Sequence, residues 1–254
     1  MKLHTQISGK GQKLVILHGF LGMGDNWKTL SKKFAEAGFE VHLPDMRNHG
    51  KSPHSSDFNY RVMVDDVHEY FNTHQIKDAI LVGHSMGGKI AMQFASRFPE
   101  LLSHLIIVDI SPKYYKPHHD DILEGLKQLK EKNLTSRQDA EDILKTKIDN
   151  QGIRLFLLKN LKREKDNHLS LKPNIDAFLK NKENIGEALP ENYTYKGQTL
   201  FIKGEHSDYI TDQDKNIISK HFSNYKIISI PNAGHWVHAE NPTTFLTKTI
   251  EFIR

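Results

Sequence analysis

The sequence predicts an α/β fold, in which a mostly parallel sheet carries helices on both faces and a helical insertion interrupts the chain. Short aliphatic runs alternate with segments of helical spacing, which is the order that builds a parallel sheet. This alternation stops near residue 112 and resumes after residue 190. The length of 254 residues is enough for one large domain with an insertion. We therefore expect a core domain, residues 1–111 and 191–254, and an inserted segment, residues 112–190.

The strands of the core are indicated by short, almost continuous aliphatic runs. A parallel strand that is covered on both faces has this pattern, because neither side of it meets water. The first run ends at His18-Gly19, as expected of a buried strand that leads into a loop. The expected strands are Lys13–Leu17, Glu40–Pro44, Ala79–Gly83, Leu105–Asp109, Thr199–Lys203 and Lys226–Ile230.

The helices of the core are indicated by apolar residues that recur every three or four positions. Trp27, Leu30 and Phe34 form one such stripe, and Gly38 follows it as a typical helix stop. Pro99 ends a second helix that is rich in small residues. The expected helices are Asn26–Ala37, Tyr60–Asn72, Lys89–Phe98, Thr211–Phe222 and Thr243–Arg254.

The inserted segment, residues 112–190, differs from the core in having helical stretches and no β-rich run. Three amphipathic helices are expected there, at Asp120–Lys132, Arg137–Thr146 and Asn174–Lys180. An insertion of this kind would cover a site on the core as a helical cap, or lid.

Composition excludes several classes of function. The chain has no cysteine, which excludes disulfides, thiolate metal sites and a cysteine nucleophile. The 35 basic and 31 acidic residues give a mild net charge of +4, and no basic block with interleaved aromatics indicates a nucleic-acid partner. The aliphatic runs are too short to span a membrane, and the first eight residues lack the apolar core of a secretory signal. A cytoplasmic location is therefore expected.

The strongest motif is Gly83-His-Ser-Met-Gly-Gly88, which follows a predicted strand and precedes a predicted helix. This is Gly-x-Ser-x-Gly in the strand–turn–helix context that a nucleophilic serine requires. The turn is so sharp that side chains at Gly83 and Gly87 would collide, so both positions need glycine. Ser85 is the predicted nucleophile, and the alternative is a glycine-rich turn with an incidental serine.

A serine hydroxyl is a weak nucleophile unless a base removes its proton. His235 is the best candidate among the 16 histidines, because it follows the last predicted strand and lies late in the chain. The alternative is a capping or solvent-exposed histidine.

The oxyanion hole requires two backbone N–H groups. The residue after the nucleophile, Met86, would supply one, and Phe20 in the loop after the first buried strand would supply the other.

The acid that would orient His235 has two candidates in the sequence. Asp109 ends the strand Leu105–Asp109, and Asp208 lies in the loop after the strand Thr199–Lys203. Both stand between Ser85 and His235 in the chain, as the order of a hydrolase triad requires. Either could equally be a turn or capping carboxylate.

The sequence contains four longer motifs, Asp45–His54, Gly83–Lys89, Val108–Pro112 and Gly234–Pro242. Together they resemble the α/β-hydrolase family over the whole chain except the insertion, and more narrowly its YbfF-like esterases. In many members of the family the acid stands three residues after a glycine like Gly204. That place is Ser207 here, and Asp208 comes one residue late. The YbfF-like group tends to lack the acid there and offers the aspartate matching Asp109, so the resemblance favours Asp109, with Ser207 as a helper hydroxyl.

The remaining candidates concern the pocket and cofactors. His84, Ser207 and Trp236 are expected to line a substrate pocket. The run His118–Asp121 does not favour a metal site, because adjacent histidines rarely chelate together, and no phosphate-binding glycine motif occurs. No cofactor and no metal are therefore expected. Asp45–His54 is interpreted as a structural connector rather than a source of proton transfer.

These observations predict a serine hydrolase that cleaves a small-molecule acyl ester or thioester through an acyl-enzyme on Ser85. Two alternatives share the fold. One is a lyase like the MenH-type enzymes of menaquinone synthesis, which the loop His18–Trp27 resembles. The other is a non-catalytic small-molecule receptor. The acyl chain length, the choice between ester and thioester, and the state of the protein as a monomer or homodimer are left open by the sequence.

Overall fold

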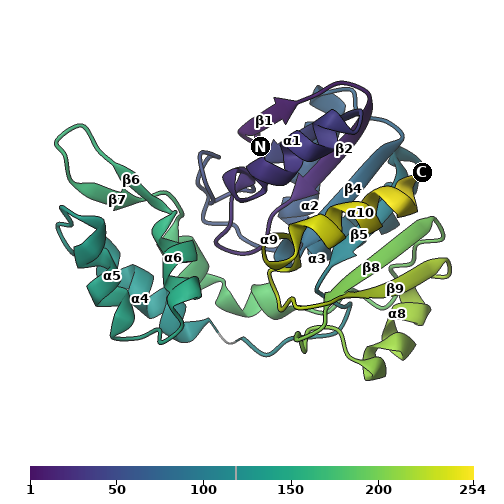
Figure 1. Ribbon diagram of the computed structural model, residues 1–254. Helices are drawn as coiled ribbons and strands as arrows, with labels where there is room; N and C mark the ends of the chain where they lie inside the picture. Colours follow the sequence, from purple (N-terminus) through teal and green to yellow (C-terminus); the bar gives the residue numbers. More distant parts are fainter. Residues whose placement is uncertain (118) are drawn as a thin grey trace.

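The computed structural model describes residues 1–117 and 119–254, and its core is a seven-stranded sheet (Figure 1). The strand order is β1-β3-β2-β4-β5-β8-β9, and every neighbouring pair is parallel except β1 with β3. The predicted α/β class with a mostly parallel sheet is confirmed. The strands are β1 Thr5–Ser8, β2 Gln12–Leu17, β3 Phe39–Pro44, β4 Ala79–His84, β5 Leu102–Val108, β8 Gln198–Gly204 and β9 Tyr225–Ile230.

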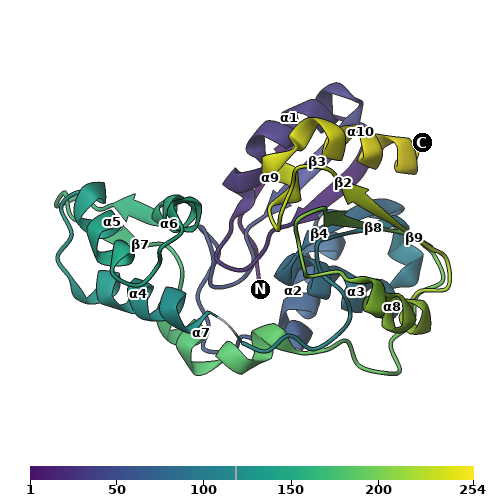
Figure 2. The same ribbon diagram turned by 60° about the horizontal axis from the view of Figure 1, so that its bottom comes forward.

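Two apolar layers sandwich the sheet, because successive side chains of each strand point to opposite faces. In β2, Leu14 and Ile16 pack into one layer, and Val15 and Leu17 pack into the other. The first layer lies under α1 (Lys28–Glu36) and α10 (Pro242–Ile253). The second layer lies under α2 (Tyr60–Thr73), α3 (Met86–Arg97) and α8 (Lys215–His221), as Figure 2 shows.

Element boundaries differ from the expectations at several places. The edge strand β1 was not expected, and its four residues are half-buried or exposed and lack an aliphatic run. Helix α3 begins at Met86, three residues earlier than expected, directly after Ser85. The expected helix 211–222 divides into a short 3-10 turn, Asp212–Asp214, and α8. Further 3-10 turns, Gly24–Trp27 and Pro99–Leu101, precede α1 and β5.

The inserted segment forms a separate group of elements beside the core (Figures 1 and 2). The expectation that it contains no β-structure is wrong, because an antiparallel hairpin of two strands joins the helices. Each of these strands has only three residues, too few to show an alternating pattern. The elements are α4 Asp120–Glu131, α5 Arg137–Lys145, α6 Gln151–Leu158, β6 Leu161–Arg163, β7 Leu169–Leu171, α7 Ile175–Lys180 and a 3-10 turn at Lys182–Gly186.

The two segments that join the insertion to the core run side by side. Tyr115 N–H donates to the carbonyl of Gly186 at 2.8 Å, and Leu189 N–H donates to the carbonyl of Pro112 at 2.8 Å. We call these paired segments, residues 112–117 and 186–190, the neck of the insertion. Within the described part of the chain, no helix has the length and apolar character needed to cross a bilayer.

Candidate active site

Ser85 stands at the sharp turn between β4 and α3. Its backbone has φ 52° and ψ −116°, a sparsely populated combination for a residue with a side chain. Hydrogen bonds on both sides hold this conformation, since Ser85 N–H donates to Val108 O at 3.0 Å and Lys89 N–H donates to Ser85 O at 3.1 Å. A Cβ at Gly83 would collide with the carbonyl of Gly87, so the turn cannot form with a larger residue there.

His235 lies on the loop between β9 and α9 (Val237–Glu240), and its ring contacts a buried carboxylate. Its Nδ1 lies 2.8 Å from Oδ2 of Asp109. Because an ionised carboxylate only accepts hydrogen bonds, this contact puts the ring proton on Nδ1 and leaves Nε2 as the acceptor. Asp109 is fully buried, whereas the His235 side chain is 20% exposed. The imidazole is therefore accessible from the site, whereas the Asp109 carboxylate is shielded from water.

Asp109 is satisfied by three donors, which offset the cost of burying its charge. Besides His235, Gly204 N–H donates to Oδ1 at 3.0 Å, and the hydroxyl of Ser207 donates to Oδ2. Asp208 is exposed on the next position of the loop, and no hydrogen bond joins it to His235 among the described residues. The structure thus brings Asp109, and not Asp208, to the imidazole.

The ring of His235 is also held on its faces. Tyr209 stacks on it, with ring centroids 3.9 Å apart and an interplanar angle of 19°. His84 lies at 4.7 Å, and its Nε2–H donates to the backbone carbonyl of His235 at 2.9 Å. Burial and the nearby His235 and His238 keep the pKa of His84 well below its usual value. His84 is therefore a neutral donor that fixes the loop of His235.

The loop after β2, which contains Phe20, is held by two neutral imidazoles. His18 Nε2 accepts from Met46 N–H at 2.9 Å, and His49 Nε2 accepts from Leu21 N–H at 3.1 Å. Burial lowers the pKa of both rings, so each keeps the acceptor that these bonds need. A Cβ built on Gly19 would stand 3.4 Å from that of Ser85, so this loop runs directly past the serine.

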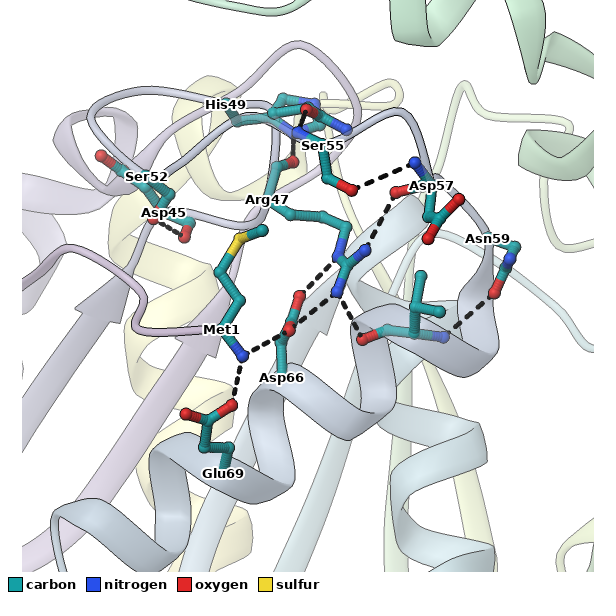
Figure 3. Close-up of polar contacts among 12 residues, drawn as sticks. Met1, Asp45, Arg47, His49, Ser52, Ser55, Asp57, Asn59, Asp66 and Glu69 are labelled. Carbon is teal, nitrogen blue, oxygen red and sulfur yellow. Dashed lines mark hydrogen bonds and ion pairs between the residues drawn. The ribbon is translucent and has the colours of Figure 1, made fainter.

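The segment Asp45–His54 supplies one of these imidazoles and supports the rest of the loop. Figure 3 shows Arg47 over Asp66 of α2, with Nε and Nη2 donating to the two carboxylate oxygens at 2.6 and 2.9 Å. Asp45 accepts from Gly24 N–H and Lys51 N–H, both at 2.8 Å. These contacts agree with the structural interpretation of this segment.

Two cavities meet at Ser85. The larger, of about 260 Å³, lies on the side of His235. The smaller, of about 30 Å³, lies on the side of Met86. Phe20 lines both cavities, and His84 and Trp236 line the larger one. Ser207 was also expected there, but it lines neither cavity, because its hydroxyl is turned inward to Asp109.

The walls of the larger cavity are mainly apolar. Among the described residues, no Asp, Glu, Lys or Arg lines it, and its polar side chains are histidines, a tyrosine, two tryptophans, Ser85 and Asn26. No group of three or more acidic or histidine side chains in residues 1–117 and 119–254 is arranged to hold a metal ion. His118, from the run considered above, lies outside the described residues.

The comparison with known proteins decides the family. The model of the alpha/beta hydrolase fold family matches residues 13–242. The chain belongs to the α/β-hydrolase family. A curated relative from Danio rerio, the sn-1-specific diacylglycerol lipase ABHD11, is 36% identical over 97% of this chain and 80% of its own length. Esterase YbfF of Escherichia coli is 30% identical over 92% of this chain and 89% of its own length.

The solved structures agree with this assignment. A marine microorganism esterase is 39% identical and superposes with a TM-score of 0.94, covering 99% of each chain. The resemblance to YbfF-like esterases is confirmed, and this α/β hydrolase has esterase and lipase relatives over nearly its full length.

Three contributors to the site of this hydrolase were not anticipated. Tyr209 follows Asp208 directly, but nothing local indicates that its ring reaches His235. His49 lay inside a recognised motif, yet its bond to Leu21 spans 28 positions. From the insertion, Asn160 is fully buried and donates through Nδ2 to the carbonyl of Leu21 at 2.9 Å. The insertion therefore supports the same loop that carries Phe20.

Proposed function

We propose that this protein is a serine hydrolase of uncharged carboxylic esters or thioesters and works through an acyl-enzyme on Ser85. The observation that carries the proposal is the His235 ring, which is bonded to buried Asp109 at 2.8 Å and lines the same cavity as Ser85. A base that is oriented by a carboxylate and shares a cavity with a serine hydroxyl is the arrangement that activates a serine.

In the proposed reaction, Ser85 Oγ attacks the acyl carbon and passes its proton to His235 Nε2. The N–H groups of Phe20 and Met86 then bind the oxyanion. Met86 is the first residue of α3, so its N–H has no partner within the helix. The C–O or C–S bond breaks as His235 returns the proton to the leaving group. Water, deprotonated by His235, then releases the acid and restores Ser85.

The charge of the cavity supports a neutral substrate. A carboxylate or phosphate taken into this space would lose its hydration, and burying it without a partner is costly. Among the described residues no Lys or Arg lines the larger cavity, and Lys116 lines only the smaller one, so an anionic group in the larger cavity would find no Lys or Arg there. This favours an uncharged ester over the anionic substrates that a lyase on this fold would process.

A fluorophosphonate probe tests the proposal directly. We expect one probe to attach per chain, on Ser85, and we expect the Ser85→Ala variant to stay unlabelled. Intact-mass measurement and peptide mapping give the stoichiometry and the site. Equal labelling of wild type and variant would refute the nucleophile. Labelling without turnover of any ester or thioester, but with loss of a conjugated pyruvoyl substrate, would favour the lyase, and no labelling at all would favour the receptor.

The two cavities further support a division of the substrate between them. The leaving group must lie beside His235, which returns its proton, and His235 lines only the larger cavity. The acyl group must then extend to the other side of Ser85, into the space of about 30 Å³ lined by Met86, Ile110 and Tyr115. We infer that the protein prefers a short acyl group on a bulky apolar alcohol.

Two isomeric esters measure this preference. Benzyl acetate joins a short acyl group to a bulky alcohol, and methyl phenylacetate has the reverse arrangement with an alcohol of similar leaving ability. We expect kcat/KM to be about tenfold or more higher for benzyl acetate, because a group too large for its pocket by several methylenes loses at least that much. Ile110→Ala, which enlarges only the smaller cavity, should bring the kcat/KM values of the two esters closer together. A higher kcat/KM for methyl phenylacetate would reverse the assignment of the two cavities.

A further inference from the structure

Lys89 carries a buried amine for which the proposed reaction has no use. It lies one helical turn after Ser85 on α3, and only 1% of it is exposed. Its Nζ donates to the carbonyl of Lys113 at 2.5 Å and to the carbonyl of Glu187 at 2.8 Å. One acceptor belongs to the segment that enters the insertion, and the other belongs to the segment that leaves it. Lys89 therefore bonds to both segments of the neck at once.

The neck is narrow at this point. Its two segments exchange the hydrogen bonds from Tyr115 to Gly186 and from Leu189 to Pro112. A Cβ at Gly186 would collide with the carbonyl of Tyr115, so the segments lie in close backbone contact. Because Lys89 Nζ bonds to one carbonyl of each segment, the insertion cannot move away from α3 without breaking these bonds.

Two stacked tyrosine rings, those of Tyr115 and Tyr209, connect Lys89 to the ring of His235. Nζ lies 5.1 Å from the centre of the Tyr115 ring, within the range of a cation–π contact. Tyr115 stacks on Tyr209 at 5.4 Å, and its hydroxyl donates to Tyr209 O at 2.5 Å while accepting from Ser111 N–H at 2.9 Å. Tyr209 in turn stacks on His235 at 3.9 Å. The position of the neck is thus connected by contacts to the face of the imidazole.

We propose that Lys89 is a positioning residue, which fastens both segments of the neck to the helix of the nucleophile. Through Tyr115 and Tyr209 it also holds the ring of His235 in place. The kinetic part of this proposal rests on the proposed function, because it takes His235 as the base. The fastening of the neck does not depend on it.

The charges around Lys89 make the fastening sensitive to pH. Burial, followed by the positive charge of Lys113, lowers the pKa of Lys89 from its ordinary 10.5 to about 7, against a smaller opposing effect of Glu187. Lys113 Nζ lies 2.8 Å from Oδ2 of Asp214, and the ring of Tyr115 lies 5.1 Å from Lys89 Nζ. Burial also raises the pKa of Glu187. A neutral amine still has two N–H groups, which match the two carbonyls.

The direction of the pH effect follows from linkage. When the neck opens, Lys89 reaches water and its pKa returns toward 10.5, so the open form binds a proton that the closed form has released. Between pH 7 and 10.5 a rise in pH therefore favours the closed neck, by up to about tenfold per pH unit. Below about pH 7 both forms are protonated, and the opening equilibrium no longer depends on this group.

Hydrogen–deuterium exchange of the full chain measures this equilibrium at the amides of Tyr115 and Leu189. After correction for the intrinsic exchange rate, we expect opening in the wild type to be constant from pH 6 to about 7 and to fall by about a hundredfold from pH 7 to 9. Lys89→Met should remove this dependence and, at pH 9, exchange about tenfold faster, because both carbonyls lose their donor.

Lys113→Met is the matched control. It leaves the two bonds of Lys89 in place but removes the positive charge of Lys113, the second cause after burial of the lowered pKa of Lys89, so the onset of the fall should move to higher pH. This variant and the wild type decide the question even if Lys89→Met does not fold. If the wild type and Lys113→Met showed the same pH dependence, Lys89 would not be the group that titrates on opening, and that result would overturn the pH-dependent fastening of the neck.

Turnover of benzyl acetate supplies the second readout. We expect Lys89→Met to lower kcat at pH 8 by about tenfold, since a loosely held imidazole spends less time in the reactive orientation. Wild-type kcat in this variant would overturn the link to His235. If the exchange behaves as expected while the wild type turns over no ester, the neck function of Lys89 stands and the proposed esterase function fails.

Discussion

Ser85→Ala and His235→Ala should each lower kcat for benzyl acetate by about 10⁵- to 10⁶-fold, the size of loss found when a serine nucleophile or its base is removed. Both losses have the same cause. Without the hydroxyl there is no acyl-enzyme, and without the imidazole the hydroxyl keeps its proton. The double variant should be no slower than either single one, because the two groups act in one step.

The remaining activity in these variants is informative as well. The N–H groups of Phe20 and Met86 are backbone groups, which both substitutions leave in place, so some acceleration over water should remain. Thermal unfolding and circular dichroism control for misfolding, and benzyl acetate binding should be retained. The mechanism would be contradicted if Ser85→Ala kept more than about one hundredth of wild-type kcat, or if the double variant were slower than both singles by orders of magnitude.

The core of the fold was predictable because its strands are buried on both faces. Such strands consist almost entirely of aliphatic residues, as Leu14–Leu17 of β2 illustrates, and they need no knowledge of their neighbours to be recognised. The edge strand β1 was missed because it is held by pairing with β3 rather than by burial of an apolar run. The hairpin of β6 and β7 was missed because its strands are too short to carry a period.

The residues of the candidate site also differ in whether a local sequence pattern indicates them. Ser85 and His235 were chosen from local patterns, a glycine turn and a histidine after the last strand, and the structure brings both to one cavity. The acid could not be chosen from the residues alone, because a shift of one position along a loop turns a side chain in another direction. Asp109 has φ 50°, and this conformation is set by bonds to Gly204 and Ile202 from a strand almost a hundred residues later.

The supporting groups lie beyond any local pattern. Tyr209 on His235, Asn160 on the loop of Phe20, and Lys89 on the neck all join segments that are far apart in the sequence. Two of these three contacts involve the insertion. The insertion therefore contributes to the geometry of the site as well as to its walls, and exchanging it for another cap would be expected to change kcat in addition to substrate choice.

Asp109→Asn should lower kcat by about 10⁴-fold, whereas Asp208→Asn should leave kcat near its wild-type value. The amide of asparagine can donate to Nδ1 of His235, which moves the ring proton to Nε2, where it blocks the removal of the serine proton. Ser207→Ala should have a smaller effect, because Asp109 would keep its bonds to His235 and Gly204. The measurement is kcat for benzyl acetate in the three variants at pH 8.

Asparagine is a suitable substitute because it isolates the charge. Asp109 has φ 50°, a conformation that asparagine tolerates better than most residues, and the amide oxygen can still accept from Gly204 N–H. Unchanged thermal unfolding in Asp109→Asn would show that the fold is kept, so that a loss of kcat reports the tautomer of His235. A loss of several orders of magnitude in Asp208→Asn, with near-normal Asp109→Asn, would instead mean that the exposed loop carboxylate turns to the ring during the reaction. In that case the buried carboxylate serves only to hold the loops of Gly204 and Ser207 together.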